Sequence, residues 1–386
     1  MRWISVFVAA VLVSISGPVN IEAQTRRDQG ASEISKSEPQ RTALPDKSRA
    51  GFPSVNTSYV DENGVVHVTR VVPVPETVSP EARRLIGSQF WNDSKEDDHA
   101  QRNSAETQLK QQRALADSTE DRLAGEALVL YPVDVKRDVI AGVPVRVITP
   151  KNAGAENDGR VLINLHGGGF VADWGSLTES IPISSLTHTK VISVLYRLAP
   201  EHPFPAAVDD ATAVYRELLK VYKPGSVGIY GTSAGAILTL ETAANLRRLR
   251  VPLPGALGVF SGTGDLTRRG DTFSLFGLTG LAGPLDATRE PILPEYVGTT
   301  DRRNPVLSPL LGDLSGFPPT LFVSSTRDML LSDTALAQRA FLRAGVTAQL
   351  IVFEALQHGF WNDPKLPESR EADGDIARFF DAHLAR

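Results

Sequence analysis

Short apolar runs alternate with helical patterns along most of this chain. The runs lie at 129–135, 143–148, 161–165, 191–196, 227–230, 257–261, 321–325 and 350–353. Helical periodicity separates several of them, most clearly at 207–222 and at 332–344, where Ser332 or Asp333 would cap the start and Gly345 would close the end. Such runs suit strands that are buried on both faces. The alternation therefore predicts an α/β fold with a mostly parallel, doubly wound sheet and helices on both faces.

Weaker patterns predict the remaining elements. Ala141-Gly142 marks a hairpin between the first two runs, and Asn63-Gly64 marks a turn within an extended segment at 54–75. A serine N-cap followed by proline starts a helix at Ser79-Pro80. The charged stretch 93–122 has too few leucines for a core helix. It therefore predicts a solvent-exposed helix that covers another part of the protein. These helical patterns lie at 79–90, 93–122 and 371–385.

The N-terminal part differs from the rest in composition. A basic Arg2, an apolar run and the small Ala23 are typical of a secretory signal, which predicts export to the periplasm or medium. Ser16 is an alternative cleavage position, and an uncleaved anchor is the alternative to cleavage, although the run is short for a membrane span. The expected divisions are a signal at 1–23, a disordered linker at 24–53, an N-terminal extension and cap at 54–126, and a catalytic domain at 127–386 with an insertion at 263–305.

Charge and cysteine content narrow the possible partners. The 386 residues carry a formal net charge of −5, and this negative charge does not favour binding to nucleic acid or to an anionic membrane. The chain contains no cysteine, so an exported form has no disulfide and depends on its core for stability. No His, Asp or Glu cluster has the spacing of metal ligands, and no metal or cofactor is expected.

The first chemical motif is Gly231-Thr232-Ser233-Ala234-Gly235, between an apolar run and a helical pattern. A serine on a sharp strand-to-helix turn requires neighbours without Cβ two positions away on each side, and both are glycine here. Ser233 is therefore a candidate nucleophile. The N–H of Ala234, at the start of the helix, would point toward an oxyanion formed beside that serine.

The second motif is His166-Gly167-Gly168-Gly169-Phe170, directly after the run 161–165. Consecutive glycines let the backbone approach a substrate and aim N–H groups at it, as an oxyanion hole requires. A phosphate-binding loop is the alternative, but the P-loop lysine and its Ser or Thr are absent. The loop is therefore a candidate oxyanion hole, and Phe170 is a candidate substrate-binding residue.

A base and an acid are sought after Ser233, because α/β-hydrolases place them in the order Ser, Asp or Glu, His. His358 follows the run 350–353 on a predicted loop, whereas His383 lies in the last helix. Asp328 follows the run 321–325, and Asp333, the alternative, suits a helix cap. His358 and Asp328 are preferred.

These motifs resemble those of the hormone-sensitive-lipase-like (bacterial family IV) esterases, which are α/β-hydrolases with a His-Gly-Gly-Gly loop and a Gly-[Asp/Thr]-Ser-Ala-Gly elbow. The segment 196–210, Tyr-Arg-Leu-Ala-Pro-Glu-His-Pro-Phe-Pro-Ala-Ala-Val-Asp-Asp, also matches the family, and the resemblance covers about 72–386. It implies an α/β-hydrolase fold with an N-terminal helical cap. The Asp-Pro that is common after the acid strand is Asp328-Met329 here.

The resemblance implies that Ser233 is the nucleophile, His358 the base and Asp328 its orienting acid. It also implies that Gly167, Gly168 and Ala234 donate their N–H groups to the oxyanion. The expected activity is hydrolysis of a small-molecule carboxylic ester through an acyl-enzyme. Acyl transfer and a non-catalytic ligand-binding relative are the alternatives. An apolar cluster in the insertion, Phe273, Leu275, Phe276 and Leu278, is a candidate pocket wall. A pocket closed by this wall would favour substrates with short-to-medium acyl chains. Phe276 is a candidate substrate-binding residue.

Overall fold

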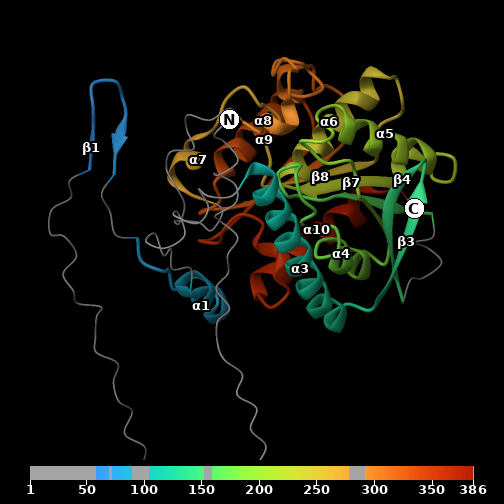
Figure 1. Cartoon of the computed structure of the whole chain (residues 1–386), viewed down its shortest axis with the longest axis horizontal. Helices are drawn as coiled ribbons and strands as arrows, with labels where there is room; N and C mark the ends of the chain where they lie inside the picture. Colours follow the sequence, from blue (N-terminus) through green and yellow to red (C-terminus); the bar gives the residue numbers. More distant parts are fainter. Residues whose placement is uncertain (1–57, 69–71, 89–103, 152–158, 278–291, 386) are drawn as a thin grey trace, which may run out of the picture. The chain divides into compact units, whose positions relative to one another are not determined.

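The computed structural model describes residues 58–68, 72–88, 104–151, 159–277 and 292–385 (Figure 1). Within these ranges the chain forms an eight-stranded sheet in the order β10-β9-β8-β7-β5-β6-β4-β3. The strands are β3 (Val133–Ile140), β4 (Val143–Pro150), β5 (Val161–Leu165), β6 (Lys190–Val194), β7 (Val227–Thr232), β8 (Ala256–Phe260), β9 (Thr320–Ser325) and β10 (Ala348–Phe353). From β6 to β10 the neighbours pair in parallel, whereas β4 pairs antiparallel with both β6 and β3. The expected mostly parallel sheet is confirmed.

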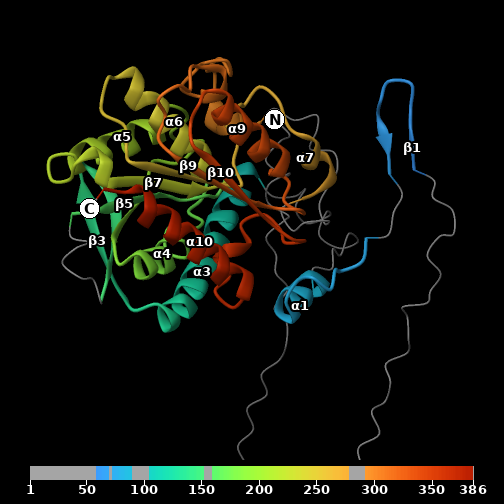
Figure 2. The same ribbon diagram turned by 180° about the vertical axis from the view of Figure 1, so that it is seen from behind.

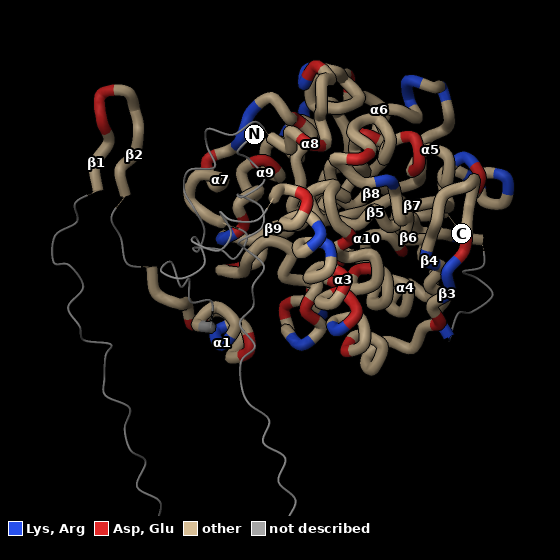
Figure 3. Tube along the Cα trace, viewed as in Figure 1, with Lys and Arg blue, Asp and Glu red and all other residues tan. Residues whose placement is uncertain are grey.

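Helices cover both faces of this sheet (Figures 1 and 2). One face carries α5 (Ala206–Leu218), α6 (Ala234–Arg248) and α9 (Leu331–Arg343), and the other carries α4 (Ser180–Thr187) and α10 (Pro367–His383). Two apolar clusters fill the spaces between helices and sheet, one on each face. Figure 3 shows the charged residues mainly on helices and loops, and β5, β7, β8 and β9 contain none. The sheet therefore supplies a buried apolar framework that positions its loops.

The N-terminal helices are α1 (Pro80–Ser88) and α3 (Ala105–Leu130). The hydroxyl of Ser79 accepts from the N–H of Ala82, as expected for a helix N-cap, and it also donates to Glu368 at the start of α10. Helix α3 buries a narrow stripe of small and polar side chains: Gln108, Leu109, Ala116, Glu120, Ala124 and Ala127. The stripe explains why counting leucines predicted only a cover, although α3 is firmly attached to the domain.

The structure corrects the expected boundary before the first strand and confirms the expected hairpin after it. Residues 129–130 belong to α3 and not to a strand, because helical hydrogen bonding continues to Tyr131 N–H and Ala127 O. The expected start of the catalytic domain at 127 thus falls inside a helix. The hairpin at Ala141-Gly142 is confirmed, and both residues have positive φ, as a two-residue hairpin turn requires.

The remaining divisions fall partly outside the described residues. The expected signal at 1–23 and linker at 24–53 lie wholly outside them. Strands β1 (Tyr59–Val60) and β2 (Val66–His67) pair antiparallel on either side of the turn expected at Asn63-Gly64, in a separate unit that ends at Val74. The insertion at 263–305 is described except for 278–291 and contains α7 (Asp271–Leu275) and α8 (Pro294–Val297). No helix within the described ranges is long and apolar enough to cross a membrane.

Candidate active site

Ser233 occupies the sharp turn between β7 and α6. Its backbone has φ 58° and ψ −118°, a conformation that side chains rarely adopt, and its side chain is partly exposed. A Cβ on Gly235 would lie 1.7 Å from the carbonyl oxygen of Leu165, and one on Gly231 would lie 2.1 Å from the same atom. Both glycines are therefore required, because the end of β5 crosses directly beside the turn.

Asp328 lies in the turn after β9 and is fully buried. Its Oδ1 atom accepts from the N–H of Leu330 at 2.9 Å and lies 2.9 Å from Nδ1 of His358. Its Oδ2 atom accepts from the hydroxyl of Ser324 at 2.8 Å and from the hydroxyl of Ser261, which follows β8. Both carboxylate oxygens thus have hydrogen-bond partners, from the same turn and from neighbouring segments, which fixes the orientation of the carboxylate.

These donors decide the charge of the Asp328 carboxyl. Burial by itself would raise its pKa, but the charge of His358, its hydrogen bond and those from Ser261 and Leu330 outweigh burial and lower the pKa. A carboxylate that remains charged in the interior stabilises an imidazolium formed beside it. It also holds the ring in one orientation.

Asp333, the alternative acid, has a different place. Its Oδ2 atom accepts from the N–H of Gly270 at 3.2 Å. It does not cap α9, because this helix begins at Leu331 and its N-cap, Leu330, makes no side-chain capping bond. The turn at Asp328 already directs the chain into the helix, so the expected cap at Ser332 or Asp333 is wrong.

His358 lies between β10 and the short helix η7 (Phe360–Asn362), and its side chain is 9% exposed. Its Nε2 atom is buried and has no hydrogen-bond partner among the described residues. His383, the alternative base, lies at the end of α10, where its Nδ1 atom contacts the carbonyl oxygen of Phe379 at 2.9 Å. The geometry therefore pairs Asp328 with His358 and leaves His383 within its own helix.

The His358 loop is attached to the elbow that carries Ser233. The indole N–H of Trp361 donates to the hydroxyl of Thr232, the residue before Ser233, at 2.9 Å. A Cβ on Gly359 would lie 3.8 Å from the methyl carbon of Thr232. These contacts bring the loop after β10 beside the end of β7, two segments that are far apart in the sequence.

The glycine loop after β5 also lies against the elbow, since a Cβ on Gly167 would be 3.5 Å from Cβ of Ser233. However, the N–H of Gly167 donates to the carbonyl oxygen of Trp174 at 2.7 Å, in an isolated bridge that prolongs the strand. The expectation that Gly167 donates to an oxyanion is therefore corrected. Gly168 and Gly169 follow with φ 100° and 62°, and their N–H groups make no backbone hydrogen bonds within the described ranges.

The two candidate substrate-binding phenylalanines differ. Phe170 is fully buried, and its ring stacks on that of Tyr296 with centroids 3.4 Å apart, so it supports the loop from behind and is unavailable to a substrate. The expectation for Phe170 is corrected because its positive φ of 65° turns the side chain into the core. Phe276 is partly exposed at the end of α7 and borders the undescribed residues 278–291, so its role stays a prediction. Leu278 of the expected pocket wall lies outside the described residues.

Helix α3 is tied to the segment that follows the glycine loop. The guanidinium group of Arg113 donates to the carbonyl oxygens of Val171 at 2.7 Å and Ala199 at 3.0 Å, and it forms two 2.7 Å contacts with the Glu201 carboxylate. Ala199 N–H in turn donates to the carbonyl oxygen of Phe170. Helix α3 thus braces the segment that follows the glycine loop.

Sequence reasoning missed several supporting side chains of this site. Ser261 and Ser324 hold Asp328, and Trp361 holds Thr232, although each looks ordinary in the sequence. For the two serines the available signal was their position at or just beyond the carboxyl end of a strand, whereas Trp361 lies in η7 and has no such signal. Within the described ranges no group of three or more His, Cys, Asp or Glu residues could hold a metal ion.

Several known proteins are similar to this chain in sequence or in structure. A family model described as alpha/beta hydrolase fold matches residues 162–362. The chain is similar to an acetyl-hydrolase of Streptomyces hygroscopicus, with 36% identity over 225 residues, or 56% of this chain and 74% of the relative. It is also similar to the crystal structure of an esterase, with a TM-score of 0.73 and 30% identity, covering 84% of this chain and 100% of that one. A solved esterase from the bacterial hormone-sensitive lipase family aligns with a TM-score of 0.64 and 29% identity, covering 80% and 99%.

Proposed function

The chain is a carboxylesterase that belongs to the hormone-sensitive-lipase-like family of α/β-hydrolases, and we propose that it cleaves small esters with Ser233, His358 and Asp328 as a catalytic triad. The observation that carries this assignment is the 2.9 Å contact between His358 Nδ1 and a fully buried Asp328 carboxylate. This contact leaves Nε2 of His358 as the nitrogen available to a nucleophile.

In the first half of the proposed reaction, the Ser233 hydroxyl attacks the ester carbonyl carbon and Nε2 of His358 takes its proton. The C–O bond to the alcohol breaks, and His358 returns the proton to the leaving oxygen. Asp328 stabilises the transient imidazolium, supported by the donors that keep its pKa low. In the second half, water attacks the acyl-enzyme through the same base and releases the acid.

The developing oxyanion needs backbone donors beside Ser233. We assign the N–H groups of Ala234, at the start of the long helix α6, of Gly168 and of Gly169 to this oxyanion hole. Gly169 replaces Gly167 in this proposal, because the N–H of Gly167 is occupied by Trp174. A Cβ at position 168 would lie 2.2 Å from the carbonyl oxygen of Ala172, so this position requires glycine.

We further propose that the acyl group is short to medium in length. The relative from Streptomyces hygroscopicus is named an acetyl-hydrolase, which supports a small acyl group. Each CH₂ of a longer acyl chain gains only about 0.8 kcal/mol by burial. Opening a closed pocket wall to admit a long chain therefore soon costs more free energy than burial of that chain contributes. We also propose that residues 1–23 direct the export of the enzyme.

Covalent labelling tests the nucleophile directly. Ser233→Ala is expected to lower kcat by several orders of magnitude without loss of the fold, since triad members act as a unit. Mass spectrometry after treatment with diethyl p-nitrophenyl phosphate should locate the phosphoryl adduct on Ser233. An adduct on a different serine, or an active Ser233→Ala protein, would exclude the assignment. Adding a competing alcohol during turnover would reveal acyl transfer as a second product.

A further inference from the structure

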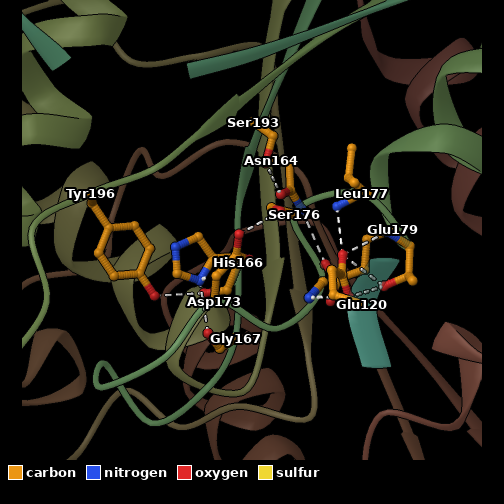
Figure 4. Close-up of polar contacts among 12 residues, drawn as sticks. Glu120, Asn164, His166, Gly167, Asp173, Ser176, Leu177, Glu179, Ser193 and Tyr196 are labelled. Atoms are coloured by element: carbon orange, nitrogen blue, oxygen red, sulfur yellow. Dashed lines mark hydrogen bonds and ion pairs between the residues drawn. The ribbon is translucent and has the colours of Figure 1, made fainter. Parts of the chain in front are cut away.

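Two buried carboxyl groups lie behind the active-site elbow, outside the residues assigned to catalysis. Figure 4 shows Glu120 of α3 and Glu179, just before α4, next to each other. Each side chain is about 3% exposed, although charged groups are rarely buried without partners. Their contacts therefore require an explanation beyond packing.

Glu120 joins the N-terminal cap to the catalytic domain. Its carboxyl oxygens accept from the backbone N–H groups of Gly175, Leu177 and Thr178 at 3.1, 2.7 and 2.9 Å. Three backbone donors from one short segment hold that segment against α3. The same segment leads back to the glycine loop, through the Gly167 and Trp174 bridge.

Glu179 has a different set of neighbours. Its Oε2 atom accepts from the side-chain amide of Asn164 on β5 at 3.1 Å, and Asn164 in turn accepts from the hydroxyl of Ser193 on β6. Its Oε1 atom is buried and has no hydrogen bond of ordinary geometry among the described residues. The side chains of Thr232 and Asn362 are its remaining polar neighbours and interact with the carboxyl.

These neighbours belong to the segments that carry the triad. Thr232 precedes Ser233, and its hydroxyl accepts from Trp361 at 2.9 Å. Asn362 follows Trp361 in η7, after His358, and its Oδ1 atom accepts from the hydroxyl of Thr178 at 2.9 Å. Glu179 therefore lies where the nucleophile elbow, the His358 loop and the segment after the glycine loop meet.

We propose that Glu179 is a positioning residue for ester hydrolysis, which holds Thr232 and the Trp361-Asn362 pair so that Ser233 and His358 keep their relative geometry. This inference rests on the proposed function of Ser233 and His358. The reacting groups must align within a fraction of an ångström, and a misplacement of about 1 Å can cost about 10²-fold in rate. Glu179 touches no reacting atom and acts through Thr232.

The protonation state predicts which substitution preserves the arrangement. Burial raises the pKa of Glu179 well above its usual value, and the nearby Glu120 adds to this, so the site favours the neutral, protonated form of the carboxyl. Glutamine has the same length and, like a neutral acid, offers one acceptor and one donor. It can accept from Asn164 and still reach Thr232, whereas alanine can do neither.

The experiment compares kcat and KM for Glu179→Gln, Glu179→Ala, Thr232→Val and the Glu179→Ala/Thr232→Val double variant. We expect Glu179→Gln to retain kcat within about threefold, and the alanine and valine variants to lose about 10- to 100-fold in kcat with little change in KM. The rate of phosphorylation of Ser233 by diethyl p-nitrophenyl phosphate should fall by the same factor. The losses of kcat in Glu179→Ala and in Thr232→Val should be strongly non-additive in the double variant, because both substitutions remove the same interaction between the Glu179 carboxyl and the Thr232 side chain.

Asp373→Ala is the matched control, since Asp373 is an equally buried carboxyl on α10, outside the segments that carry the triad. It should leave kcat unchanged. The proposal is overturned by wild-type kcat in folded Glu179→Ala, by a loss confined to KM, or by additive effects in the double variant. If Glu179→Ala does not fold, wild-type kcat in Thr232→Val overturns it instead. The proposed function fails separately, if Ser233→Ala remains active.

Discussion

The Asp333→Asn substitution is expected to stabilise the protein at neutral pH and to leave ester hydrolysis nearly unchanged. Asp333 is buried in α9, and burial raises the pKa of its carboxyl to about 6 from 3.8. The nearby Asp265 adds to the increase, while the N–H of Gly270 and the charge of Arg269 oppose it. The carboxylate form is therefore unfavourable in the folded protein.

The direction of the pH effect follows from proton binding. Between pH 4 and 6 the folded protein keeps the Asp333 proton while the unfolded chain has lost it, so the free energy of unfolding falls as pH rises through this range. A pKa difference of about 2 units corresponds to about 3 kcal/mol, which is lost by pH 7. Asparagine carries no charge and can still accept from Gly270, so the variant should recover about 1–3 kcal/mol at pH 7.

Urea unfolding of both proteins at pH 4, 5, 6, 7 and 8 measures this effect. The difference in stability between variant and wild type should be small at pH 4, grow to pH 6 and then stay constant. Taking the difference cancels the titration of other buried carboxyls, such as Glu241 and Asp373. A difference independent of pH, or a variant less stable than wild type at pH 7, would refute the reasoning.

The matched substitution at the other aspartate has the opposite signature. Asp328→Asn removes the carboxylate that orients His358 and should lower kcat by about 10⁴-fold, by analogy with the serine-protease triad. Asp333→Asn should keep kcat within a few-fold of wild type. A larger loss of kcat at Asp333 would reverse the assignment of the acid.

Further substitutions test the geometry of the elbow and the pocket. Gly235→Ala would place Cβ 1.7 Å from the carbonyl oxygen of Leu165, so it should abolish activity or folding; soluble protein with wild-type kcat would show that the turn tolerates a side chain. Gly168→Ala, with φ 100° and Cβ 2.2 Å from the carbonyl oxygen of Ala172, should lower kcat more than KM, and an unchanged kcat would remove Gly168 from the oxyanion hole. On acetyl, butyryl, octanoyl and palmitoyl esters, kcat/KM should be highest for acyl chains of about two to six carbons. Phe276→Ala should shift that preference toward longer chains, and an unchanged profile would exclude Phe276 from the pocket.

The features that the sequence determines are those that depend on neighbouring residues. Buried strands and amphipathic helices have characteristic periods, so most elements of the sheet were predicted within a few residues. The glycines on either side of Ser233 follow from the local turn, and the structure shows the close approach that requires them. The α3 helix was underestimated because its buried stripe consists of small and polar residues, which a count of leucines does not detect.

The features that only the tertiary structure decides are those that join distant segments. His166-Gly167-Gly168-Gly169 offers several equivalent N–H groups in the sequence, and the bridge to Trp174 removes that of Gly167. Asp328 and Asp333 look alike as acids after the same strand, but Ser261, from another strand end, holds only Asp328. The burial of Glu179 behind Thr232 likewise has no local signal. The physical reason is that a parallel sheet brings the carboxyl ends of strands from distant parts of the chain to one edge. The hydrogen bonds formed there depend on how neighbouring strands are aligned, which no local sequence pattern specifies.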